Sequence, residues 1–139
     1  MKYLLASVLA LAVTAGVVAQ VKRTPSPKGA EVYFITPADG ATVTSPVTVK
    51  FGLKGMGVAP AGIAFEGAGH HHLIVDAPLP PLDAPVPSDA HHLHFGKGQT
   101  ETTVELKPGK HTLQLLLGDQ SHIPHDPAVK SKQITITVK

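Results

Sequence analysis

The sequence contains no cysteine and no tryptophan among its 139 residues, and aromatic residues make up only 4% of it. Without cysteine the chain has neither disulfides nor thiolate ligands, and its fold must be held by packing alone. Iron–sulfur clusters, cysteine-ligated zinc sites and type 1 copper sites are therefore excluded.

A strong charge of either sign is also missing. The chain has 12 basic and 10 acidic residues, and the basic residues form no stripe along the sequence. Nucleic acid is therefore not expected as a partner. The low net charge argues neither for nor against binding to a membrane surface.

The first residues have the three-part pattern of a secretory signal. Lys2 supplies a positive charge, Leu4 to Val18 carries no charge, and Val17-Val18-Ala19 offers small side chains for cleavage. A membrane anchor is the alternative, but the run is shorter than the roughly 20 residues that a spanning helix needs. We expect residues 1–19 to be removed, leaving a periplasmic or secreted protein without a membrane span.

The mature chain of about 120 residues suits one domain with a modest core. Residues 20–30 are polar and include Pro25 and Pro27, which predicts a flexible leader. The single His-rich domain is expected over residues 31–139.

No segment shows a helical apolar period over three turns, whereas short alternating runs are frequent. The expected strands cover residues 31–36, 46–53, 69–76, 91–95, 100–106, 111–117 and 132–138. Residues 77–88 include five prolines and predict a long surface loop. The pattern indicates an all-β immunoglobulin-like or fibronectin-type antiparallel β-sandwich of about seven strands. His111, after a Pro-Gly turn, would supply the ring at the strand corner of such a fold.

The nine histidines are the most informative feature, because they are clustered. On a strand, residues i and i+2 share a face, so two runs each present a pair of imidazoles. A third group lies in a proline-containing loop near the C-terminal end. The six candidate metal ligands are His70, His72, His92, His94, His122 and His125.

Imidazole suits copper(II) and zinc, so a copper or zinc ion is the expected cofactor. Asp76, Asp119 and Asp126 lie near these groups as further ligands or as residues that orient a ring. Packing roles are expected instead for three other histidines and for the one mature methionine; these are His71, His91, His111 and Met56.

No catalytic nucleophile or phosphate-binding loop is evident, so a non-catalytic binding protein is favoured over an enzyme. The leading hypothesis is an exported domain that binds a transition metal for carriage, buffering or sensing, with another periplasmic protein as a further candidate partner. One alternative is a structural or interaction module whose histidines form internal hydrogen-bond networks. Another is a metalloenzyme with three histidines and an open coordination position.

The sequence resembles the bacterial family of exported domains of unknown function numbered 4399. The resemblance covers residues 34–138 and depends on the segments GHHHLIVD (69–76), HLHFGKGQTE (92–101), GKHTLQLLLGD (109–119) and HIPH (122–125). It implies a small exported domain and supports the histidine groups as a site, but it implies no particular chemistry.

Overall fold

The computed structural model describes residues 20–139, so the expected signal peptide at residues 1–19 lies outside the described residues. Within the described part the chain forms strands and no helix, and hence no helical segment there has the length and apolarity to cross a membrane. The strands are β1 (Glu31–Thr36), β2 (Thr42–Val43), β3 (Val47–Lys54), β4 (Gly57–Val58), β5 (Ala68–Val75), β6 (His92–His94), β7 (Glu101–Val104), β8 (Gly109–Gly118) and β9 (Ile134–Val138).

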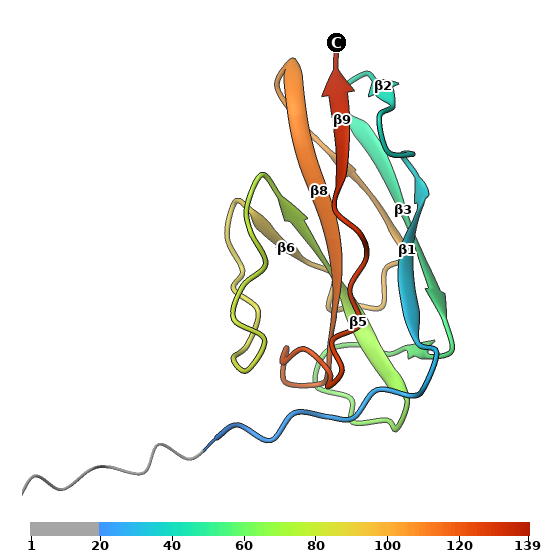
Figure 1. The fold of residues 1–139 in the computed structure, drawn as a ribbon, viewed down its shortest axis with the longest axis vertical. Helices are drawn as coiled ribbons and strands as arrows, with labels where there is room; N and C mark the ends of the chain where they lie inside the picture. Colours follow the sequence, from blue (N-terminus) through green and yellow to red (C-terminus); the bar gives the residue numbers. More distant parts are fainter. Residues whose placement is uncertain (1–19) are drawn as a thin grey trace, which may run out of the picture.

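The strands form two sheets, and in Figure 1 β1 and β3 of the smaller sheet lie to the right of β8 and β9 of the larger one. The smaller sheet has the order β1-β3-β7, and the larger has the order β2-β9-β8-β5, with β4 and β6 both pairing with β5. An immunoglobulin-like sandwich places strands A, B and E in one sheet and C, F and G in the other. Here β1, β3 and β7 take the first set of places, and β5, β8 and β9 take the second. The predicted all-β sandwich is confirmed.

The main core lies between the two sheets and follows the alternation of each strand. Strands β5, β8 and β9 contribute one set of aliphatic side chains, and β1 and β3 contribute the opposing set. The fully buried members include Val49, Leu73, Leu115, Leu117 and Ile136. His71 points into this core with Leu73, and its ring lies 5.0 Å from that of Phe51 between centroids. The packing role expected for His71 is confirmed.

The outer face of the larger sheet is also buried, because the long loop between β5 and β6 folds over it. Ile74 and Leu116 are 1% and 0% exposed, and they pack there against Val86 of that loop. The prolines keep the loop out of the sheet, and its apolar side chains still remove sheet surface from water. All of β5 is therefore buried on both faces, and the histidines on its outer face are enclosed.

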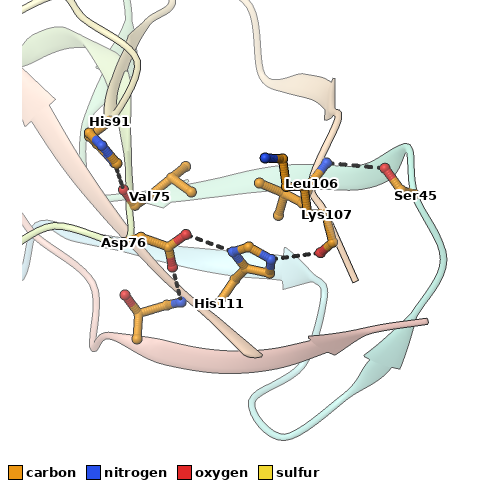
Figure 2. Close-up of polar contacts among 8 residues, drawn as sticks. Ser45, Val75, Asp76, His91, Leu106, Lys107 and His111 are labelled. Carbon is orange, nitrogen blue, oxygen red and sulfur yellow. Dashed lines mark hydrogen bonds and ion pairs between the residues drawn. The ribbon is translucent and has the colours of Figure 1, made fainter. Parts of the chain in front are cut away.

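A histidine corner joins the end of β5 to the start of β8 (Figure 2). The His111 ring donates from Nδ1 to Asp76 Oδ2 at 2.6 Å and from Nε2 to the carbonyl of Lys107 at 2.8 Å. The hydrogen bond to Asp76, followed by that to Lys107, raises the pKa of His111. The corner role expected for His111 is confirmed, with Asp76 as its partner.

Candidate metal centre

Strand β5 places two imidazoles on the outer face of the larger sheet. His70 and His72 are two residues apart, so both point to the same side, and they are 0% and 1% exposed. The antiparallel register of β5 and β6 sets His72 opposite His94. Strand pairing alone therefore brings three histidines from two segments together.

The fourth histidine comes from the loop between β8 and β9, which is wound around the buried carboxylate of Asp119. One carboxylate oxygen, Oδ1, accepts hydrogen bonds from the backbone N–H groups of Ser121 and Ile123 at 2.9 and 3.0 Å. The backbone N–H of His122 donates to the carbonyl of Asp119 at 2.9 Å. His122 has a φ of 66°, a left-handed conformation that is uncommon for a residue with a side chain. The loop thus holds His122 in a strained conformation that directs its ring toward β5.

These four rings form one compact group. His70, His72, His94 and His122 each offer a nitrogen, and these nitrogens all lie within 4.8 Å of one another. His70 Nε2 and His122 Nδ1 share a hydrogen bond of 3.1 Å. Neither nitrogen of His72, nor Nδ1 of His70, has a hydrogen-bond partner among the described residues, although all are buried. The group therefore has unused nitrogen atoms in a place that water does not reach.

Two glycines make room for the rings. A Cβ atom at Gly118 would lie 2.7 Å from His72 Cε1, and one at Gly96 would lie 2.3 Å from His94 Cε1. Both distances are too short for a real side chain, so each ring packs directly against glycine backbone. The sequence around the histidines therefore shapes the site as much as the ligands themselves do.

Burial keeps the inner imidazoles neutral. Desolvation, with the nearby charges of His94 and His122, lowers the pKa of His70 to about 4. Desolvation, with the charges of the other three rings, lowers the pKa of His72 to about 3. Burial and then His122 also lower the pKa of His94. Neutral imidazole is the form that binds metals, so these rings have free lone pairs at neutral pH.

The structure does not bring all six candidate ligands together. His92 lies outside the group, since its Nδ1 is 2.9 Å from Asp89 Oδ1 at the start of β6. His125 is 1% exposed, and its Nε2 is 3.3 Å from the carbonyl of Ala68. The i, i+2 spacing predicts that two side chains lie on the same face of a strand, but it does not predict that their rings meet at one site. Each ring also turns toward its own polar partner, as those of His92 and His125 do.

The three candidate carboxylates are also separated. Asp119 lies closest to the group, where its charge acts on His70 and its backbone shapes the His122 loop. Asp76 instead contacts His111, and Asp126 lies 3.4 Å from Arg23 in an ion pair. Met56 packs against the main core, as expected. Among the described residues, the group is therefore made of imidazoles, with one carboxylate behind it.

A segment that was expected to be a flexible leader contributes to the site. Thr24 Oγ1 donates to Asp119 Oδ2 at 2.6 Å, and Arg23 Nε donates to the carbonyl of Pro124 at 3.0 Å. In Figure 1 this blue segment runs along the same end of the molecule as the red loop after β8. No local sequence signal indicated these contacts, because they join residues about 100 positions apart in the chain.

Comparison with known proteins identifies a family to which the sequence is similar. A family model described as "Domain of unknown function (DUF4399)" matches residues 49–139, which include all four histidines of the group. No curated protein and no solved structure matches the chain. The resemblance seen in the sequence segments is confirmed, and it carries no assigned activity.

Proposed function

We propose that this chain, which belongs to the DUF4399 family of domains of unknown function, binds a transition metal ion, copper or zinc, through His70, His72, His94 and His122. One observation carries the proposal: four imidazole nitrogens from three segments lie within 4.8 Å of one another. Imidazole is a common ligand for both metals.

The buried nitrogens without partners support the same conclusion. A buried polar group without a hydrogen bond costs about 1–3 kcal/mol of stability. His72 has two such nitrogens and His70 has one. A bound ion would take the lone pair of one His72 nitrogen and so remove part of this cost, whereas Nδ1 of His70 would stay unpaired if Nε2 of that ring bound the ion.

The proposed biological role is metal carriage, buffering or sensing outside the cytoplasm. It relies on the signal-like residues 1–19, which would deliver the domain to the periplasm or to the medium. A site that depends on thiolate ligands can be lost in an oxidising compartment when its cysteines are oxidised. This chain has no cysteine, so a site made of imidazoles would not be lost in that way.

The first test measures metal affinity and thermal stability in tag-free protein. Copper(II) and zinc are offered in competition with a chelator, and we expect at least one to bind more tightly than micromolar. Saturation at about a hundredfold excess over Kd should raise Tm by about 10 °C.

The matched variants are His94→Ala and His92→Ala, which remove neighbouring histidines of the same short strand. Only His94 belongs to the group, so His94→Ala should lose most of the affinity and of the Tm increase, whereas His92→Ala should keep both. Equal losses in the two variants, or no metal uptake by the unmodified protein, would refute the proposal.

An internal hydrogen-bond network is the second candidate, and the 3.1 Å contact between His70 and His122 favours it. In that case His122→Ala should lower Tm in chelator-treated protein by as much as in metal-treated protein. Metal binding instead predicts that the difference in Tm between the unmodified protein and His122→Ala widens when metal is added.

A further inference from the structure

The arrangement of the four rings carries information about which ion they fit. The six distances between ring centroids define the shape of the group. Five of them fall between 4.7 and 5.2 Å, and the sixth, between His72 and His122, is 6.1 Å. In a flat arrangement with these five distances the sixth would be about 8.4 Å, so the observed 6.1 Å shows that the four rings do not lie in one plane.

Elementary geometry gives the values for each coordination type. With metal–nitrogen bonds of about 2.0–2.1 Å, four imidazoles at the corners of a tetrahedron have all six centroid distances near about 5 Å. A square arrangement gives four distances of about 4.5 Å and two of about 6.4 Å. The observed set matches a tetrahedron with one widened edge.

One pair of ring nitrogens already has a spacing that fits a shared ion. His70 Nε2 and His122 Nδ1 are 3.1 Å apart. Two nitrogens on one tetrahedral zinc are separated by about 3.3 Å, and neighbouring nitrogens on a square ion by about 2.9 Å. This pair therefore fits either geometry, and the choice between them depends on the ring centroids.

The surroundings restrict the movement of part of the group. The His72 ring lies against the backbone of Gly118, and the His94 ring lies against Gly96. The backbone of His122 is held by Asp119 on one side, and its carbonyl accepts a hydrogen bond from Val86 N–H at 2.9 Å on the other. These contacts limit the movement of the His72 ring and of the His122 backbone, whereas the exposed His94 ring is less confined.

We propose that this centre is shaped for a tetrahedral ion, zinc(II), and that its shape reduces the affinity advantage that copper(II) has over zinc(II) at a flexible set of histidines. The inference rests on the proposed function and adds the identity of the ion. Copper(II) favours a tetragonal arrangement, whereas zinc has no geometric preference of its own and is usually tetrahedral in proteins. Copper(I) favours sulfur ligands, and the mature chain's one methionine, Met56, packs against the core and not in this group.

The first measurement uses cobalt(II) as a spectroscopic substitute for zinc. We expect one equivalent of cobalt(II) to give the intense visible absorption of a tetrahedral complex, and one equivalent of zinc to abolish it. The weak absorption of a six-coordinate complex would overturn the inference while leaving metal binding intact.

The second measurement compares the affinities for copper(II) and zinc in the unmodified protein and in His122→Ala. Removal of the loop histidine leaves three imidazoles and free positions for water, so copper(II) regains its preferred geometry. We expect the ratio of copper(II) affinity to zinc affinity to rise at least tenfold in His122→Ala. An unchanged ratio, or a square-planar copper(II) electron paramagnetic resonance spectrum in the unmodified protein, would contradict the inference.

The two proposals fail in different ways. If the protein takes up no metal at all, the proposed function fails, and the choice of ion fails with it. If it binds metal tightly but with a square or six-coordinate spectrum, only the tetrahedral preference is refuted.

Discussion

At the scale of single residues, the candidate centre depends on two positions that have no side chain. Gly96 and Gly118 lie where a Cβ atom would overlap the rings of His94 and His72. The His72 ring is buried and cannot retreat, because the interior is close-packed. Gly118 therefore sets the position of the His72 ring, whereas the exposed His94 ring has more freedom beside Gly96.

Replacing Gly118 with alanine should weaken metal binding about tenfold or more, because the new methyl group displaces the His72 ring. The measurement is a chelator competition with zinc on purified Gly118→Ala protein. Gly57→Ala is the control, since a Cβ there would meet its nearest neighbour at an ordinary 3.9 Å. Equal affinities in Gly118→Ala and Gly57→Ala would show that the glycine does not shape the site.

At the scale of elements, the loop between β8 and β9 connects the centre to the beginning of the described chain. Residues 23–26 lie along this loop and exchange backbone hydrogen bonds with Asp126, at 2.9 Å from Asp126 N–H to Thr24 and 3.1 Å from Ser26 N–H to Asp126. Thr24 also donates to the Asp119 carboxylate, which supports the backbone on both sides of His122. Thr24 therefore acts on the candidate centre through Asp119, and we expect it to be a positioning residue for His122.

Thr24→Val removes this hydroxyl without a large change in volume, and we expect it to weaken zinc binding about threefold to tenfold. A net hydrogen bond to a charged group is worth about 1.5–3 kcal/mol, and only part of that would reach the ligand. Thr24→Ser keeps the hydroxyl and should restore the affinity. If Thr24→Val lowers Tm but leaves the zinc affinity unchanged, its role is structural only.

At the scale of the whole molecule, the His111 corner links stability to pH (Figure 2). Its pKa is raised in the folded protein by the hydrogen bond to Asp76. A raised pKa means that the folded state binds the proton more tightly than the unfolded state does. The contribution of the His111–Asp76 pair to the free energy of unfolding is fully present below the ordinary histidine pKa of about 6.5. It is lost as the pH rises through the raised pKa that His111 has in the folded protein.

Asp76→Asn should therefore destabilise the protein more at pH 5.5 than at pH 9, measured by urea unfolding in the presence of a chelator. Asparagine keeps an oxygen for the backbone N–H of Thr112, which donates to Asp76 Oδ1 at 2.8 Å, and removes only the charge. Protonation of the buried histidines at low pH affects Asp76→Asn and the unmodified protein alike, so it cancels in the difference between their free energies of unfolding. If that difference were the same at pH 5.5 and pH 9, an imidazolium at position 111 would be contradicted.

Much of the fold could be predicted from the sequence, because strand alternation is a local property. All seven expected strands are present, although β2 and β4 were not foreseen because each has only two residues. The assignment of His71 to the core and of His70 and His72 to the opposite face followed from the same alternation. The family resemblance was visible in local segments as well.

The selection of ligands was not predictable in the same way. His92 and His94 have the same spacing as His70 and His72, yet only His94 lies in the group. The ring of His92 is instead hydrogen-bonded to the carboxylate of Asp89. His125 follows His122 by three residues and turns toward Ala68. These choices depend on partners that are distant in the sequence or set by the shape of a loop.

The sequence by itself determined that this chain is a cysteine-free β-sandwich with clustered histidines, because composition and period-2 alternation are local properties. Only the tertiary structure decided which histidines lie together. The group depends on the register between β5 and β6, on the left-handed conformation of His122 and on the space beside Gly96 and Gly118. It also decided that the rings of His70 and His72 are buried and neutral, because the proline-rich loop packs on that face of the larger sheet.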